Sequence, residues 1–231
     1  MTKVLGILPA RGGSKGVPRK NVRLLLGKPL ITWAACALSS SKYVSRAICS
    51  TDDIEIANAA IAAGLEVPWL RQPDLAGDKT LVVDVLNDAL ERLAAEGDAG
   101  YHYIALAQAT SPTVRVEDID NAIELAISHN ADTVITGFDA GQRHPATMFS
   151  LSRDNQVHWL MDAEERMARR QDLQPYFIRT GLIYVIKRET LVENRSIYGK
   201  RVFCMPVSEE CALTIDDERD FEMAEYILRK R

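Results

Sequence analysis

Residues 4–21 read VLGILPARGGSKGVPRKN, and this stretch decides the fold class. The run from Val4 to Leu8 is continuously apolar and ends at Pro9, which is typical of a strand buried inside a parallel sheet. A loop rich in glycine follows directly, and it carries four basic residues, Arg11, Lys15, Arg19 and Lys20. Open α/β sheets bind ligands at the carboxyl ends of their strands, so this loop stands where a ligand is expected.

The composition of the loop suits an anion. Its glycines allow the backbone to approach a ligand closely and to take up positive φ, and successive N–H groups in such a turn form an anion nest. The spacing matches neither the P-loop pattern G-x-x-x-x-G-K-[ST] nor the dinucleotide pattern G-x-G-x-x-G. The residues alone therefore predict a polyphosphate site of another type. The alternative is a solvated basic loop, which would not require the glycines.

The rest of the chain alternates between strand and helix patterns. Strands are expected at residues 47–50, 67–70, 103–107, 133–136, 182–187 and 201–206. Helices are expected at residues 29–40, 53–63, 81–95, around 119–127 and at 217–229. Asp52 is the expected N-cap of the helix at 53–63, with Glu55 completing a capping box. The alternation predicts an α/β fold of three layers, a mostly parallel sheet with helices on both faces, in a single domain spanning 1–231.

The alternation breaks after Gly137. Residues 138–172 carry scattered apolar positions and the charged stretch DAEERMARR at 162–170. Such a segment is a poor candidate for the core. We expect it to form an extension that reaches outside the sheet.

Composition narrows the class of protein. The 231 residues carry a net charge of −4, which argues against a nucleic-acid partner. The four cysteines lack C-x-x-C spacing, and no apolar run approaches the ~20 residues that a membrane span needs. No signal peptide is recognised at the N-terminus. These features predict a cytoplasmic protein with reduced thiols and no membrane partner.

Several segments in order resemble the CMP-N-acylneuraminate (sialic acid) synthetases and their relatives that act on other nonulosonic acids. They are Pro9–Asn21, Ser50–Asp53, Arg71–Ala76, Gln108–Pro112, Arg170–Leu173 and Ile215–Phe221, and the resemblance covers nearly the whole chain. It implies a Rossmann-like nucleotidyltransferase fold and a CTP-dependent enzyme. Such an enzyme transfers CMP to the anomeric hydroxyl of a sugar acid and releases pyrophosphate. It also implies a Mg²⁺ cofactor and a homodimer, with residues 138–172 as the dimerisation extension.

The resemblance also implies which residues hold the nucleotide. Those expected to bind it are Arg11, Gly12, Gly13, Ser14, Lys20, Asn21, Arg71, Asp78 and Thr80. Those expected to act in catalysis are Lys20, Arg11, Gln108 and Asp216. Taken alone, Arg71 would be read as a surface arginine and Gln108 as a loop amide that caps the next turn.

The expected metal ligand is Asp216. Many relatives carry Asp-Ile-Asp where this chain has Thr214, Ile215 and Asp216, so the first carboxylate is missing. Either one carboxylate suffices for Mg²⁺, or water fills the gap, or Asp217 substitutes. The other interpretation makes Asp216 or Asp217 simply the N-cap of the last helix.

The sugar half of the site departs more from the family. The resemblance implies sugar contacts from Gln108, Arg170, Gln171, Arg179 and Tyr184. An arginine fork suits the carboxylate of a sugar acid. Ala109, Thr180 and the pair at 197–198 differ from the usual residues, and His144 is either a substrate contact or a structural histidine. The alternatives are therefore legionaminic acid or an amino-substituted Kdo-type sugar as acceptor, or a non-catalytic nucleotide-sugar-binding protein.

Overall fold

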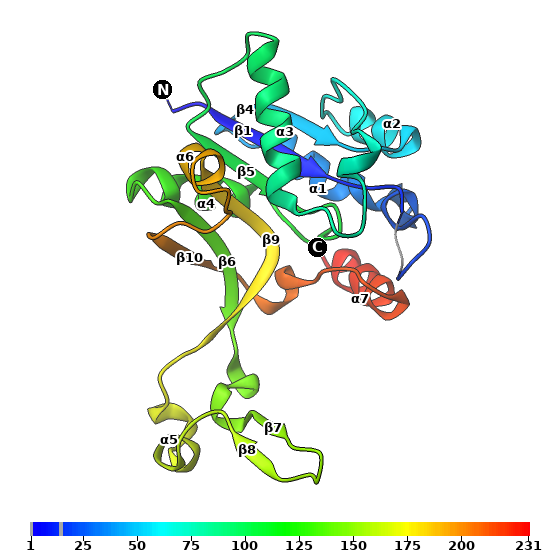
Figure 1. Cartoon of the computed structure of the whole chain (residues 1–231). Helices are drawn as coiled ribbons and strands as arrows, with labels where there is room; N and C mark the ends of the chain where they lie inside the picture. The colour runs from blue at the N-terminus through cyan, green and yellow to red at the C-terminus, as the bar shows by residue number, and fades with distance from the viewer. Residues whose placement is uncertain (1, 14–15) are drawn as a thin grey trace.

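The protein is built around a six-stranded sheet with helices on both faces (Figure 1). This computed structural model describes residues 2–13 and 16–231, except for the side chain of Arg170. The strand order is β10 (Val202–Pro206), β6 (Thr133–Asp139), β9 (Phe177–Lys187), β5 (Tyr103–Ala107), β1 (Val4–Pro9) and β4 (Val44–Ser50). β9 runs antiparallel to β5 and β6, and the other pairs are parallel. The predicted three-layer α/β fold is confirmed.

Alternating side chains of β1 enter two cores. Val4 and Leu8 pack on the face covered by α1 (Leu30–Ser39), α2 (Ile54–Ala62) and α4 (Val116–Ser128). Leu5 and Ile7 pack on the face covered by α3 (Val82–Ala95) and α6 (Arg188–Val192). All four side chains are fully buried, so the continuous apolar run is explained by burial on both faces.

A third, smaller core joins the two ends of the chain. The last helix, α7 (Glu218–Arg229), buries Phe221 and Ala224 against Val17 and Leu25, with Ile215 between them. Leu25 belongs to a small hairpin of β2 (Leu24–Leu25) and β3 (Lys28–Pro29). This core fixes the segment around residue 216 beside the loop that follows β1.

Two local expectations are wrong. Residues 67–70 form no strand: the described pairing there is one bridge between Ile48 and Glu66, and Pro68 has no N–H with which to continue a ladder. The N-cap of α2 is Asp53, not Asp52. Asp53 Oδ1 accepts the N–H groups of Glu55 and Ile56 at 2.8 and 3.2 Å, which is how an N-cap side chain bonds.

The extension projects from the sheet as a separate lobe (Figure 1). β6 and β9 run on past the sheet as a two-stranded stem, pairing Asp139 with Phe177. Beyond it lie the hairpin of β7 (Phe149–Leu151) and β8 (Val157–Trp159), and the short helix α5 (Ala163–Met167). His144 is buried at the base, where Nε2 donates to the carbonyl of Gln174 at 3.0 Å and Nδ1 accepts the Ala146 N–H. His144 is therefore a structural histidine.

Two remaining features bear on the predicted class. All four cysteines are free thiols. Among the helices that the structure describes, none combines the length and apolarity that crossing a membrane would require.

Candidate active site

A cavity of about 520 Å³ opens where β1 and β5 end. It is lined by Pro9, Ala10, Arg11, Gly16, Lys20, Asn21, Val82, Leu106, Gln108, Ala109, Thr110 and Asp216. The four residues predicted to act in catalysis, Arg11, Lys20, Gln108 and Asp216, thus meet at one cavity, although Lys20 and Asp216 stand 196 residues apart. The position at the carboxyl edge of the sheet is the one that the topology favours for ligands.

Lys20 ties the loop after β1 to the segment before α7. It begins a 3-10 turn, Lys20–Val22, and its side chain is only 12% exposed. Its Nζ donates to the carbonyl of Ile215 at 2.6 Å and lies 3.3 Å from Asp216 Oδ1. An ammonium held at this point is placed to neutralise a phosphate that enters the cavity.

The loop glycines are needed for close packing. A Cβ atom on Gly16 would lie 2.3 Å from the backbone oxygen of Asp216, and one on Gly12 would lie 2.7 Å from Asp53 Oδ2. Among the described residues of this loop, positive φ occurs at Arg19, at 56°, and not at Gly12 or Gly13, where it was expected. Ser14, a predicted phosphate ligand, lies outside the described residues.

Asn21 lines the cavity and carries an unsatisfied acceptor. Its side chain is buried, its Nδ2 donates to the carbonyl of Arg11 at 3.0 Å, and its Oδ1 has no hydrogen-bond partner among the described residues. Buried polar atoms are nearly always paired, so an orphaned acceptor at a cavity wall indicates a ligand donor.

A second cavity of about 300 Å³ adjoins the first and shares Arg11 and Val82 with it. Arg71, Asp78 and Thr80, the remaining predicted nucleotide residues, line this second cavity. Arg11 is paired with Asp78 at 2.6 Å.

Arg71 is buried rather than a surface residue. Its guanidinium donates to the hydroxyl of Ser50 at 3.1 Å, to the Ser50 carbonyl, and to the Leu75 carbonyl at 3.4 Å. Burial lowers the pKa of Arg71, because desolvation penalises its charge. The charge of a buried cation held by neutral oxygens is stabilised by an electron-rich ligand group beside it.

The predicted sugar residues are only partly brought together. Gln108 packs against Gly181, where a Cβ atom would lie 2.9 Å from its Oε1. Arg179 donates to the hydroxyl of Tyr184 at 3.3 Å and also to that of Tyr198. Burial raises the pKa of Tyr184, which keeps its hydroxyl protonated.

One predicted sugar contact, Gln171, lies away from the cavity, and one residue that was not predicted, Tyr198, joins the others. Gln171 belongs to a 3-10 turn of the extension, is exposed, and does not line the cavity of its own chain. Tyr198 joins the Arg179 cluster although it was not among the predicted sugar contacts. Its sequence signal was the resemblance, which sets Ile197 and Tyr198 where sialic-acid enzymes carry aromatic residues in the sugar half of the site.

The segment before α7 offers one carboxylate. Asp217 is the N-cap of α7, and its Oδ1 accepts the N–H groups of Arg219 and Asp220 at 2.8 and 3.1 Å. The hydroxyl of Thr214 faces that of Ser111 at 3.5 Å. Asp216 is left as the carboxylate at the cavity, with its side chain 80% exposed.

This donor set fits magnesium that is shared with a substrate. No cluster of three or more metal-binding side chains occurs among the described residues, so a site made of protein alone is not present there. Mg²⁺ commonly takes one or two carboxylates and completes its shell with phosphate oxygens and water. A single Asp216 beside two cations that suit phosphate meets that requirement.

These features define a class. A glycine-rich basic loop at the carboxyl edge of a mostly parallel sheet, facing one carboxylate, can hold a nucleoside triphosphate for transfer without a covalent intermediate. No histidine or cysteine lines the described cavity. The fold and the cavity are those of a nucleotidyltransferase.

Comparison with known proteins narrows the class. The chain belongs to the cytidylyltransferase family, whose sequence model matches residues 5–230. It is 31% identical to the CMP-N,N'-diacetyllegionaminic acid synthase of Campylobacter jejuni, over 99% of this chain and 96% of that enzyme. It is also 31% identical to the N-acylneuraminate cytidylyltransferase of Streptococcus agalactiae, over 95% of this chain but only 52% of that protein.

A solved structure supports the fold. A CMP:2-keto-3-deoxy-manno-octonic acid synthetase, solved in complex with CTP, superimposes with a TM-score of 0.71 over 99% of both chains. The two sequences are 16% identical, so this likeness bears on the fold alone. The resemblance found in the sequence is thereby confirmed at the level of family and fold.

Proposed function

We propose that this cytidylyltransferase transfers CMP from CTP to the anomeric hydroxyl of a sialic-acid-like sugar acid. The observation that carries the proposal is the cavity itself. It places Arg11, Lys20, Gln108 and Asp216 around a space of about 520 Å³, beside the orphaned acceptor of Asn21. The names of the relatives, which act on diacetyllegionaminic acid and N-acylneuraminate, support a nine-carbon sugar acid as acceptor.

The reaction is one in-line displacement. The anomeric oxygen forms a bond to the α-phosphorus of CTP, the bond from that phosphorus to the bridging oxygen breaks, and pyrophosphate leaves with the electron pair. The hydroxyl proton is lost to solvent. Arg11 and Lys20 stabilise the charge that accumulates on the departing phosphates, and positioning supplies the rest. Gln108, between the cavity and Gly181, would orient the acceptor.

Magnesium is the proposed cofactor, and Asp216 is its proposed ligand in this chain. When bound, Mg²⁺ neutralises the phosphate oxygens and favours the ionised form of the attacking hydroxyl. Lys20 is paired with Asp216 here, so its ammonium exchanges that carboxylate for phosphate when CTP enters.

Arg179 is the proposed receptor for the acceptor's carboxylate. Its fork is held by the hydroxyls of Tyr184 and Tyr198, and no ion pair occupies it among the described residues. A bidentate arginine suits a carboxylate better than a lysine would. Arg170 and Gln171 are proposed to reach the site of the partner subunit in a homodimer. The free thiols suit the cytoplasm, where disulfides are rare.

The test measures pyrophosphate release from CTP and Mg²⁺ with a panel of sugar acids. The panel contains N-acetylneuraminic acid, diacetyllegionaminic acid and an amino-substituted Kdo-type sugar. Turnover with one of them supports the proposal and selects the acceptor. CTP binding without turnover on any of them would favour the second candidate, a non-catalytic nucleotide-sugar-binding protein, for which the missing carboxylate at Thr214 is the argument.

A further inference from the structure

The four residues Ser50–Asp53, which begin with the last residue of β4, have no part in the reaction described above, yet each contacts the nucleotide half of the site. The carbonyl of Ser50 accepts the N–H of Ala10 at 3.0 Å, where the loop begins. Its hydroxyl accepts from Arg71 at 3.1 Å. Thr51 is fully buried, and its hydroxyl accepts the N–H of Asp53 at 3.2 Å, which fixes the turn.

Asp52 holds the first part of the loop. Its Oδ1 accepts the backbone N–H of Gly12 at 3.0 Å. Because this N–H is occupied, it is not part of an open anion nest, and the loop is anchored there by a carboxylate from the turn that follows β4. Gly12 also packs directly on Asp53, which leaves no room for a side chain.

Asp53 divides two tasks between its two oxygens. Oδ1 caps α2, while Oδ2 pairs with the guanidinium of Arg19 at 2.5 Å. Glu55 adds a second contact to Arg19 at 2.5 Å, but its side chain is 67% exposed, whereas that of Asp53 is 16% exposed. Although burial opposes it, the Arg19 contact and the two N–H groups hold the pKa of Asp53 below its usual value.

Arg19 is turned away from the cavity. It does not line the cavity, whereas its neighbour Lys20 does. Its backbone adopts the left-handed conformation, with φ of 56° and ψ of 26°, which a residue with a side chain adopts only at a cost. The contact with Asp53 compensates for that cost, and the left-handed turn sends the next residue toward Asp216.

We propose that Asp52 and Asp53 are positioning residues that hold the loop at Gly12 and Arg19, so that Arg11 and Lys20 face the phosphates of CTP. This role rests on the proposed function. Arg19, one of the four basic residues of the loop, then serves to hold the loop rather than to bind phosphate. We call its ion pair with Asp53 the latch.

The test separates the latch from the helix cap. Asp53→Asn keeps a carbonyl oxygen for the cap, which asparagine fills as well as aspartate, but it faces Arg19 with a donor. We expect CTP binding, measured by calorimetry, to weaken about three- to tenfold, in line with the loss of one charge-assisted contact. The KM for CTP should rise, the KM for the sugar acid should not change, and the melting temperature should stay within about 2 °C.

Arg19 provides the double-mutant cycle. Arg19→Gln should weaken CTP binding as much as Asp53→Asn, and the double variant should be no worse than either single one. Arg19→Lys should recover part of the loss, because it restores the charge. Hydrogen exchange of the peptide covering residues 8–23, followed without CTP, should be faster in both single variants.

Glu55→Gln is the matched control, since it removes an exposed carboxylate from the same guanidinium of Arg19. We expect it to change the affinity for CTP less than about twofold. An equal loss in Glu55→Gln, additive losses in the double variant, or unaltered CTP binding in Asp53→Asn would each overturn the latch. A wild-type chain that does not bind CTP would instead overturn the proposed function.

Discussion

Single residues of the site are fixed by neighbours far along the chain. Gly16 is the clearest case, because a Cβ atom on Gly16 would lie only 2.3 Å from the backbone oxygen of Asp216. Backbone cannot move aside as a flexible side chain can. We therefore expect Gly16→Ala to push the loop off the segment before α7, to cost about 1–3 kcal/mol of unfolding free energy, and to weaken CTP binding.

Gly13→Ala is the comparison for stability, since no atom of the described residues lies within 4 Å of its Cβ position. Its unfolding free energy, measured by chemical denaturation, should match that of the unaltered chain. Equal stability of Gly16→Ala would show that the loop and the segment before α7 are not packed as described.

Adjacent aspartates before α7 are expected to behave differently. Asp216→Asn should lower turnover on the order of a hundredfold and raise the Mg²⁺ concentration needed, because it removes the proposed ligand. Asp217→Asn should retain turnover, since asparagine caps a helix as well as aspartate. A Mg²⁺ titration of pyrophosphate release measures both. Loss of activity in Asp217→Asn alone would reverse the assignment.

The resemblance to a known family selected the site residues, and sequence reasoning failed where a contact depends on tertiary structure. It brought Arg11, Lys20 and Asp216 to one edge. It could not tell Asp52 from Asp53 as the N-cap, because the two are adjacent at the start of the helix. Which of them caps depends on the backbone φ and the side-chain rotamer that each adopts. Nor could it foresee that Asp52 would bond Gly12, since that contact joins two separate loops.

Among the elements, the core strands of the sheet were predictable, but the continuation of β9 into the stem of the extension was not. β9 was expected at residues 182–187 but begins at Phe177, because its first residues pair with β6 in the stem of the extension. The first residues of β9, Phe177–Arg179, are partly or fully exposed, and Arg179 interrupts the apolar run that marked the core strands. The false strand at 67–70 had such a run, but Pro68 within it removes a ladder donor.

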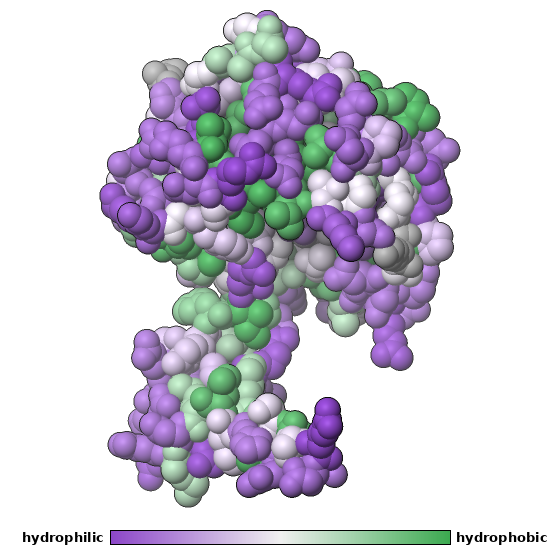
Figure 2. Space-filling view, viewed as in Figure 1, coloured by the Kyte–Doolittle hydropathy of each residue, from purple (hydrophilic) through white to green (hydrophobic). Residues whose placement is uncertain are grey.

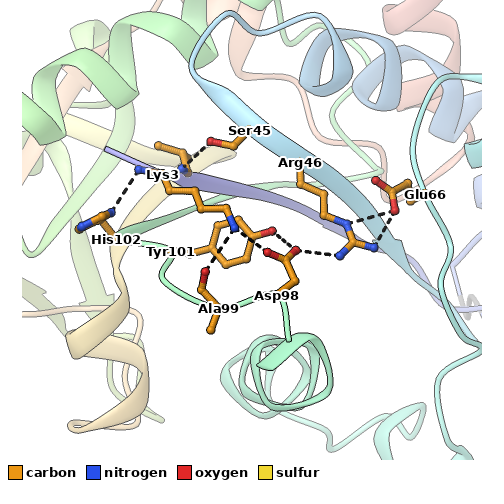
Figure 3. Close-up of polar contacts among 9 residues, drawn as sticks. Lys3, Ser45, Arg46, Glu66, Asp98, Ala99, Tyr101 and His102 are labelled. Atoms are coloured by element: carbon orange, nitrogen blue, oxygen red, sulfur yellow. Dashed lines mark hydrogen bonds and ion pairs between the residues drawn. The ribbon is translucent and has the colours of Figure 1, made fainter. Parts of the chain in front are cut away.

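A polar cluster holds the ends of β1, β4 and α3 together at the opposite edge of the sheet from the cavity (Figure 3). Asp98, just beyond α3, pairs with Lys3 at 2.5 Å and with Arg46 at 2.8 Å, and it accepts the hydroxyl of Tyr101. Burial alone would raise the pKa of Asp98, but these hydrogen bonds hold it well below its usual range.

The cluster predicts a pH dependence of stability. A depressed folded pKa means that Asp98 contributes stability above the unfolded pKa, and that this contribution fades as acid protonates it. At pH 7 we expect Asp98→Asn to cost about 1–2 kcal/mol. The difference in unfolding free energy between the variant and the unaltered chain should stay constant down to about pH 5 and shrink below it. Urea unfolding at several pH values measures this difference; one that widens with acid would contradict the assignment.

For the whole molecule, the extension exposes apolar residues among polar ones on its surface (Figure 2). Its large exposed apolar side chains include Phe149, Leu151, Trp159, Leu160 and Met167. Exposed apolar patches of this kind mark interaction surfaces, and a two-fold homodimer is the commonest way to cover them. The predicted dimerisation extension therefore stays a prediction with a physical basis.

A dimer would also explain why Gln171 lies far from the cavity of its own chain. If the extension completes the partner's site, two inactive variants should rescue each other. Lys20→Ala disables the cavity, and the double variant Arg170→Ala with Gln171→Ala disables the extension. In a mixed dimer of the two, one site would carry both defects and the other site would carry neither.

Unfolding the two variants together and refolding them, or expressing them together, should thus restore a substantial part of the pyrophosphate release that each lacks alone. Sedimentation of the mixture would confirm that mixed dimers form. Each variant refolded with itself is the control, since no intact site can arise there. If mixed dimers form and remain inactive, residues 170 and 171 serve their own chain, and the extension must fold back toward the sheet during the reaction.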